Sequence, residues 1–351
     1  MHVTRPREFV GRGARRGAGR ARKRAASSVM NAILAAATPE AILRLLGEPI
    51  AAALRVPVQS LQLLPIDGVT PRADAPAVLR VVDASAKSRA VVLCSAPKFP
   101  DMVERAMTRA EQARSRLAAA EAAAILRPLL EGRIDGLSYS ILPHCDPLSA
   151  HRWSWRLQRA LLGPRLLDWL YRVTADTVAP ADAAQRDARF AAPLACLGSL
   201  DPLSAPVRAD TARAASRLRD GSWQPRHVLM HGDLWKGNIL IEPGAARPGR
   251  TRWRDRFVVI DWPGSELHGH AIYDLIRLAR SMRTPDAALR AEVRRHCDVL
   301  GASIEDAMAY LLSALGYIAL HLEEFPMDKY LPMVEACHAD LRRIHTLTDR
   351  S

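Results

Sequence analysis

The first part of the chain alternates short apolar runs with turn-rich separators, a pattern typical of β-strands. One helix comes first: Thr38 is placed to act as its N-cap, Pro39 fits its first position, and Gly47 is expected to end it. The separators are rich in Asp, Pro and Ala, residues that are frequent in turns and loops. Three strands are therefore predicted, at residues 58–64, 77–82 and 90–95.

The period of the pattern then changes. Residues 101 to about 130 are rich in Ala, Arg and Glu and predict one long helix, and residues 137–142 predict a further strand. That strand leads into the sequence PHCDP at residues 143–147, a natural boundary between two parts of the chain.

Beyond this boundary the pattern is mainly helical. Helices are predicted at 151–162, 165–177 and 209–218, and four more are predicted between 272 and about 348. Short Val- and Ile-rich runs at 227–230, 239–242 and 257–260 predict three strands between the helical blocks. The expected class is α+β with two lobes: a disordered basic tail (1–29), a small β-rich lobe (30–145) and a larger, mainly helical lobe (146–351).

The positive charge of the chain is concentrated at its N-terminus. The formal net charge is +13, and residues 1–25 hold nine Arg or Lys residues against one Glu, which leaves only +5 for the rest. Charge of this sign suggests nucleic acid or an anionic surface as a partner, but the low apolar content predicts a solvated, disordered tail. A nucleic-acid-binding arm and a transit-type presequence are the alternatives that the tail leaves open.

Cysteine usage and hydrophobicity indicate the compartment. The five cysteines are odd in number and widely spaced, without a CxxC pair, so neither a disulfide framework nor a zinc site is indicated. The strongest apolar segment, residues 307–320, is shorter than the roughly 18 residues of a membrane span. We therefore expect a cytoplasmic protein with reduced thiols and no membrane span.

The most informative segment is 228–242, VLMHGDLWKGNILIE, followed by 257–262, FVVIDW. It places Asp233, Asn238 and Asp261 at or near strand ends, where loops on a rigid frame usually carry chemistry. Two carboxylates and one amide are hard oxygen ligands of the kind that hold Mg²⁺ against phosphate oxygens. Phosphoryl transfer needs little else beyond a group that orients and deprotonates the attacking hydroxyl.

Three segments in this order resemble one family. HGDLWKGN at 231–238 is similar to the H-G-D-x-x-x-x-N loop of the aminoglycoside phosphotransferase, choline kinase and fructosamine kinase superfamily, small-molecule relatives of the protein kinases. IDW at 260–262 falls where that superfamily carries its second metal-binding aspartate, and GHAIYDL at 269–275 resembles its G-D-P-x-x-D-L segment. The resemblance covers roughly residues 40–345 and implies a protein-kinase-like fold.

The same resemblance implies a role for each matching residue. Asp233 corresponds to the catalytic base, and Asn238 and Asp261 correspond to the Mg²⁺ ligands. His231 is expected to shape the loop rather than to act as a second base. Asp274 is expected to accept hydrogen bonds from backbone amides and so to hold the catalytic loop.

The chain departs from the superfamily at the third strand, where an apolar-apolar-Lys pattern supplies a lysine for the α and β phosphates. Cys94 stands at that position here. Lys98, just after the strand, is the best substitute, with Arg80 on the preceding strand as the second choice. Glu111 resembles the glutamate that pairs with this lysine, and Glu104 competes with it.

The leading hypothesis is a kinase that uses ATP and Mg²⁺ to phosphorylate a hydroxyl of a small molecule such as an amino sugar, an amino alcohol or a sugar, with the nucleotide near residues 143–146. Acidic residues of the last helices would suit a cationic acceptor, although a solvated acidic face explains them as well; they are Glu323, Glu324, Asp328, Glu335 and Asp340. Two alternatives stay open. One is a kinase-like binding module that has lost catalysis, suggested by Cys94, and the other is a nucleic-acid-binding protein, which rests on the tail alone.

Overall fold

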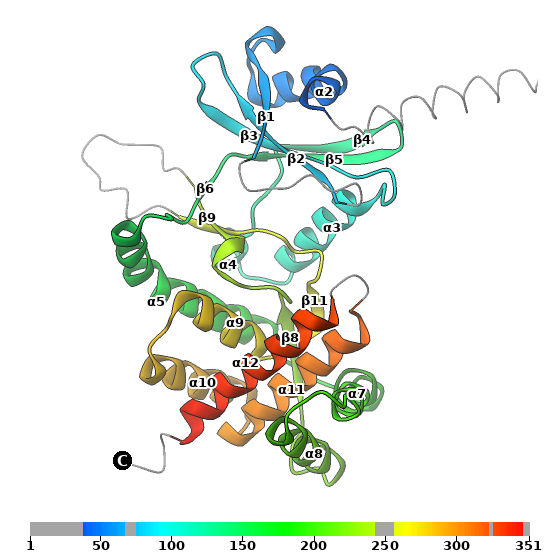
Figure 1. Ribbon diagram of the computed structural model, residues 1–351, viewed down its shortest axis with the longest axis vertical. Coiled ribbons are helices and arrows are strands. Elements are labelled where there is room, and N and C mark those ends of the chain that lie inside the picture. The colour runs from blue at the N-terminus through cyan, green and yellow to red at the C-terminus, as the bar shows by residue number, and fades with distance from the viewer. Residues whose placement is uncertain (1–37, 67–74, 243–255, 323–325, 347–351) are drawn as a thin grey trace, which may run out of the picture. The chain divides into compact units, whose positions relative to one another are not determined.

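The computed structural model describes residues 38–66, 75–242, 256–322 and 326–346, and the chain divides into two compact units (Figure 1). The first unit comprises Met1–Arg105 and Arg127–His144. The second comprises Ala106–Leu126 and Cys145–Ser351. The basic tail expected at residues 1–29 lies outside the described residues.

The first unit is built on one antiparallel sheet of five strands in the order β1-β2-β3-β5-β4. Alternate residues of the strands, such as Val81, Val92 and Ile141, form its core together with one face of helix α2. The predicted strand at 58–64 is only partly correct, because Val58–Ser60 forms a 3-10 turn before the strand begins. The strands are β1 Gln62–Pro65, β2 Ala77–Val82, β3 Ser88–Cys94, β4 Leu130–Ile134 and β5 Leu137–Pro143.

Helix α2 spans Pro39–Leu54 and begins as predicted, because the Thr38 hydroxyl accepts a hydrogen bond from a backbone N–H of the first turn at 3.3 Å. Its predicted end at Gly47 is wrong. The apolar stripe that starts at Ile42 continues to Ile50, and both side chains are buried in the core of the unit. Burial of this stripe outweighs the tendency of glycine to interrupt a helix.

The long helix predicted at 101–130 is wrong in its second half. Helix α3 covers Met102–Arg114, a single turn α4 follows at Ala119–Ala122, and the chain then enters β4. A main-chain contact explains the change, because Val259 N donates a hydrogen bond to Ala124 O at 2.7 Å. Tertiary pairing of the backbone overrides helix propensity here.

The second unit is mainly helical, with two small three-stranded sheets in the orders β10-β9-β6 and β11-β8-β7. Its helices are α5 Arg152–Thr177, α6 Ala183–Arg186, α7 Ala192–Gly198, α8 Ala205–Arg219, α9 Tyr273–Met282, α10 Asp286–Leu300, α11 Ile304–Leu320 and α12 Met327–Thr346. Its strands are β6 Asp146–Pro147, β7 Ala179–Pro180, β8 Arg226–Met230, β9 Ile239–Ile241, β10 Phe257–Val259 and β11 Glu266–Gly269.

Helices α9 to α12 confirm the four helices predicted after residue 272. The two helices predicted at 151–162 and 165–177 form the single helix α5, which continues through Pro164 because Leu162 and Leu166 are both buried in the core. Within the described ranges no single helix is long and apolar enough to cross a membrane; α10 and α11 meet that test only as a pair bent by 88°.

Helix α11 forms the centre of the second unit and is buried over most of its length. A capping box starts it, in which the side chains of Ser303 and Asp306 each accept a hydrogen bond from the backbone N–H of the other residue. Gly316 allows a close approach to α7, since a Cβ at this position would lie 2.0 Å from Pro193 O. The core around α11 provides the rigid frame on which α9 and the loop after β8 are mounted.

Candidate active site

The loop between β8 and β9 contains the motif residues 231–238. It follows a buried strand and ends in a 3-10 turn, Lys236–Asn238, after which β9 begins. Gly232 has φ +86°, and a Cβ on it would lie 2.6 Å from Gly264 O, so glycine is required at this turn. This close approach places the loop directly against the segment that follows β10.

Asp274, in the first turn of α9, holds the start of this loop. Its carboxylate accepts hydrogen bonds from His231 N at 2.6 Å and from Gly232 N at 3.1 Å, which confirms the expected structural role. Burial raises the pKa of Asp274 to about 6, while the backbone donors act in the opposite direction. The group is therefore ionised at neutral pH and acts as a charged acceptor.

Two further residues of α9 bind the same loop. Arg277 Nη2 donates to Asp233 Oδ1 at 2.9 Å, and Ser281 Oγ accepts a hydrogen bond from Lys236 N at 3.0 Å. Arg277 was not identified by the sequence analysis. Asp274, Arg277 and Ser281 are spaced i, i+3 and i+7 and so share one face of the helix, and this spacing is the sequence signal that could have identified Arg277.

His231 is a buried residue that joins two loops. Its Nδ1 accepts a hydrogen bond from Asp233 N at 3.3 Å and its Nε2 donates to Ile260 O at 3.0 Å, a pattern that fits the neutral ring with its proton on Nε2. The ring also packs against Trp262, with 4.5 Å between centroids. Burial lowers the pKa of His231 to about 4, so these contacts hold the loop in place with an uncharged ring.

Asp233 and Asn238 are brought together by the 3-10 turn. Asn238 Nδ2 donates to Asp233 O at 2.9 Å and to Asp233 Oδ2 at 3.3 Å. Half of the Asp233 side chain is exposed (50%), whereas Asn238 is buried. Because Nδ2 is bonded to Asp233, Oδ1 is the side-chain atom of Asn238 that can bind a cation.

Asp261 lies at the same end of the β9–β10 ribbon as Asn238. The two strands are antiparallel with Ile239 opposite Val259, and Ile260 N donates to Asn238 O at 3.0 Å. The register therefore places the residue before β9 beside the residues that follow β10. Asp261 has φ +69°, a left-handed conformation that costs a non-glycine residue energy and that clusters at functional sites.

The charges at this end of the ribbon suit a cation. The Asp261 side chain reaches solvent. Its pKa is nevertheless raised, first by the protein atoms packed around it and secondly by the negative charge of Asp233. The Asp261 carboxylate and Asn238 Oδ1 form a hard oxygen set that fits Mg²⁺. Among the described residues no group of three His, Cys, Asp or Glu side chains could hold a metal ion, so an ion here would also need oxygens from a bound ligand or water.

The residues expected to bind the nucleotide phosphates lie in the first unit. Lys98 is exposed after β3, with its Nζ 4.8 Å from the centre of the Phe99 ring. Arg80 lies on β2 opposite Val91, and its buried Nε has no hydrogen-bond partner in the described part of the chain. Cys94 is buried in the core of the unit, and burial raises its pKa to about 11, so this position carries a neutral thiol.

The two candidate partner glutamates are both bound to arginine. Glu111 on α3 pairs with Arg114, one turn further along the same helix. Glu104 pairs with Arg133 of β4. The ion pairs of the described residues therefore include no Lys–Glu pair of the expected kind.

Several acidic residues of α12 are engaged within the protein. Glu335 accepts hydrogen bonds from Ser204 N at 2.7 Å and from Ser204 Oγ at 2.8 Å, just before α8. Asp340 pairs with Arg280 of α9 at 2.7 Å. Residues 323–324 lie outside the described ranges. The carboxylates of Glu335 and Asp340 therefore have structural partners.

No family model matches the chain, and no curated protein matches it. Solved structures do match. The GDP complex of wild-type aminoglycoside 2'-phosphotransferase-IIIa is 14% identical with a TM-score of 0.50, over 85% of this chain and 98% of that one. The GDP and kanamycin complex of APH(2")-IIia is 14% identical with a TM-score of 0.48, over 84% and 97% of the two chains.

A glucosamine kinase in complex with glucosamine, ADP and inorganic phosphate is 19% identical with a TM-score of 0.42, over 85% of this chain and 82% of that chain. At such identities a structural likeness speaks for the fold alone. The chain has the α+β, two-lobed, protein-kinase-like fold of the aminoglycoside phosphotransferases, and at the level of the fold this confirms the resemblance seen in its motifs.

Proposed function

We propose that this chain transfers the γ-phosphoryl group of Mg²⁺-bound ATP to a hydroxyl group of a small molecule. The observation that carries the proposal is the joining of three motif residues at one end of the β9–β10 ribbon. Asn238 is bonded to Asp233, and Asp261 leaves the ribbon beside it. A base with two hard oxygen ligands is the set that phosphoryl transfer requires.

In this proposal Asp233 orients the acceptor hydroxyl and takes its proton. The acceptor oxygen forms a bond to the γ-phosphorus, the bond between that phosphorus and the bridging oxygen breaks, and ADP leaves. Arg277 and Asn238 hold the two carboxylate oxygens of Asp233 in position. Asn238 Oδ1 and Asp261 would hold Mg²⁺, which when bound offsets negative charge on the transferred group.

For the nucleotide site we propose two alternative cationic residues. Lys98 or Arg80 would replace the missing third-strand lysine, and Glu111 would take part as its partner after giving up Arg114. The aminoglycoside 2'-phosphotransferase-IIIa structure is a GDP complex, so GTP is tested beside ATP as the donor.

For the acceptor we propose a small hydroxylated compound such as an amino sugar, an amino alcohol or a sugar. The acidic residues of α12 do not strengthen the case for a cationic acceptor. Glu335 already accepts hydrogen bonds from Ser204, and Asp340 already pairs with Arg280. The acceptor class therefore rests on the fold and the catalytic loop, and a screen has to include neutral and acidic hydroxyl compounds as well.

The test is ADP release by the purified full chain with Mg²⁺-ATP and a panel of such acceptors. Asp233→Asn should lower turnover by about 10²- to 10⁴-fold, the range for loss of a general base. Asp261→Asn should also lower turnover strongly, because it removes a charged Mg²⁺ ligand, and the thermal melt of both variants should stay near that of the wild type. Asp298→Asn, an exposed residue on α10, is the matched control and should keep full turnover. Near wild-type turnover in Asp233→Asn would contradict the proposal.

A second candidate function is favoured by Cys94. A kinase-like binding module without catalysis would tolerate a neutral thiol in the core where a phosphate-binding lysine is expected. The melting temperature distinguishes the two functions when it is measured with and without Mg²⁺-ATP, because a ligand that binds the folded state alone raises it. Stabilisation by nucleotide without ADP release across the whole acceptor panel would favour the binding module.

A further inference from the structure

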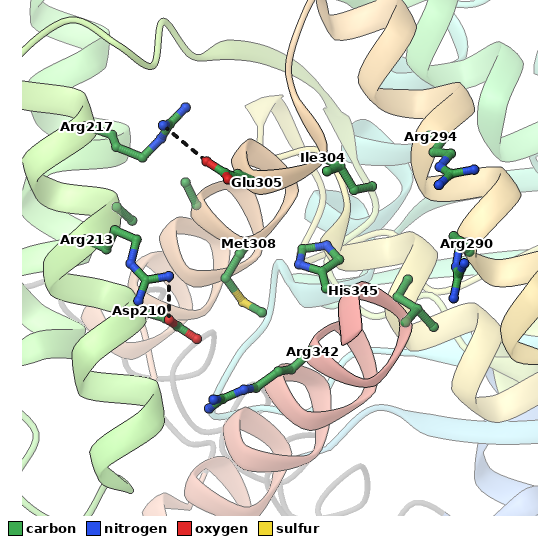
Figure 2. A pocket seen from close by; sticks show the side chains of 13 residues that line it. Asp210, Arg213, Arg217, Arg290, Arg294, Ile304, Glu305, Met308, Arg342 and His345 are labelled. Atoms are coloured by element: carbon green, nitrogen blue, oxygen red, sulfur yellow. Dashed lines mark hydrogen bonds and ion pairs between the residues drawn. The ribbon is translucent and has the colours of Figure 1, made fainter. Parts of the chain in front are cut away.

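A basic pocket lies within the second unit between helices α8, α10, α11 and α12 (Figure 2). Its volume is about 450 Å³, within the range of small-molecule sites. None of its lining residues belongs to the loop at 231–238 or to α9. The pocket is therefore separate from the catalytic residues of the same unit.

The lining of this pocket has an excess of positive charge. Five arginines face two carboxylates, which leaves three more positive than negative charges; these residues are Arg213, Arg217, Arg290, Arg294, Arg342, Asp210 and Glu305. Figure 2 shows Arg213 and Arg217 on one side, Arg290 and Arg294 on the other, and Arg342 nearest the lower edge. Like charges that line one pocket repel one another, and an anion bound among them would offset that repulsion.

The arginines of α8 are already paired within the protein. Arg217 Nη2 donates to Asp306 at 2.7 Å and Arg217 Nη1 contacts Glu305 at 3.4 Å. Arg213 lies 3.5 Å from Asp210, which also accepts a hydrogen bond from His338. Both carboxylates of the lining are thus occupied by α8 and α12 donors and are not free to neutralise the remaining arginines.

The other three arginines of the lining have no such partners in the part of the chain that the structure describes. Within the described residues Arg290, Arg294 and Arg342 form no hydrogen bond or ion pair, and Arg290 Nε is buried without an acceptor. A buried donor without a partner costs free energy, and a guanidinium group presents a fork of N–H donors that matches phosphate oxygens. Ile304 and Met308 of α11 add an apolar wall beside these groups.

We propose that this pocket binds a small anion that carries phosphate groups, held by Arg290 and Arg294 of α10 and by Arg342 of α12. Phosphate is favoured because three guanidinium groups without partners supply more donors and charge than a single carboxylate can satisfy. The limited volume argues for a small molecule, since a phosphorylated peptide or a nucleic acid would need an extended surface. The pocket is a second ligand site, independent of the nucleotide proposed for the catalytic loop.

The probe is inorganic pyrophosphate, titrated calorimetrically into the full chain in EDTA-containing buffer so that no Mg²⁺ complex forms at Asn238 and Asp261. Wild-type protein should bind one equivalent, and binding should weaken as sodium chloride is raised. Arg290→Gln and Arg342→Gln should each weaken binding about tenfold, the loss expected for one charge-assisted contact. Arg219→Gln, an exposed arginine on α8 outside the lining, is the matched control and should bind as the wild type does.

Three results with small anions would overturn the proposal. They are no binding to the wild type, unchanged binding in the Arg290→Gln/Arg342→Gln double variant, and tighter binding of malonate than of pyrophosphate, which would assign the site to dicarboxylates. Tight binding of a phosphopeptide with no binding of pyrophosphate would assign the surface to a macromolecule and would also overturn it. If the double variant melts early, Arg294→Gln replaces it, because that side chain is exposed.

Discussion

The two units differ in how they hold the side chains that are predicted to carry out the chemistry. In the second unit the loop at 231–238 is bound at several points to one helix, and both oxygens of Asp233 accept hydrogen bonds, from Arg277 and Asn238. In the first unit Lys98 stands exposed after β3, and the position of the expected phosphate-binding lysine is a buried thiol, Cys94.

This difference shows which parts of a phosphotransferase fold depend on backbone geometry. The chemistry proposed for the loop at 231–238 needs its amides and carboxylates in fixed places, so its support is spread over the backbone and over the buried residues His231 and Asp274. A phosphate-binding cation is a long, flexible side chain that can reach its ligand from several backbone positions. A change such as Cys94 at one position therefore leaves the fold of the first unit intact.

Among the changes that probe how each unit is held together, the largest effect is expected from Asp274→Ala. This change leaves His231 N and Gly232 N without their acceptor, at a cost of about 1–3 kcal/mol each, and lets the loop move. ADP release should fall about a hundredfold, as expected when reacting groups are misplaced by about 1 Å. Asp187→Ala, at an exposed site, is the control. Normal turnover in a folded Asp274→Ala protein would show that the loop does not depend on α9.

A smaller loss is expected from Arg277→Gln, which removes the charged donor to Asp233 Oδ1. One hydrogen bond to a charged group is worth about 1.5–3 kcal/mol, so kcat should fall about tenfold to a hundredfold. The KM for ATP should stay unchanged, and Arg277→Lys should recover part of kcat. A lowered melting temperature with unchanged kcat would give Arg277 a structural role only.

The smallest effect is expected from Cys94→Ala in the first unit. The buried thiol is lost from the core, which should lower the free energy of unfolding by about 1 kcal/mol. Turnover and the KM for ATP should not change, and Val92→Ala on the same face of β3 should destabilise more. A raised KM for ATP in Cys94→Ala would mean that this position contacts nucleotide, and the contrast between the units would disappear.

The placement of the residues in the loop at 231–238 could be predicted from the sequence because it follows from the order of strand, loop and strand. Asp233, Asn238 and Asp261 fall at strand ends, and pairing of β9 with β10 then brings them to one end of a ribbon. Arg277 was not found because its partner lies 44 residues earlier in the chain. Only its i, i+3 relation to Asp274 on an amphipathic helix pointed toward the same loop.

Element boundaries failed where tertiary contacts decide them. Gly47 does not end α2, because Ile50 on the next turn is buried in the sheet core. The helix predicted at 101–130 gives way to β4, because the backbone at Ala124 pairs with Val259 of β10. In both cases the deciding contacts are with residues that are distant in the sequence: the strands of the sheet core for Ile50, and Val259 for Ala124. Local propensity alone could therefore not predict these outcomes.

Three hydrogen bonds that backbone amides of the loop at 231–238 donate to side chains of α9 also limit how the loop can move. The amide protons of His231, Gly232 and Lys236 point at side chains of one helix face, so they can exchange with solvent only when that face separates from the loop. Such an opening breaks all three contacts together and exposes part of the core around α9. The loop at 231–238 is thus one cooperative unit with the helical core, and under the proposed function any gating movement has to come from other segments of the chain.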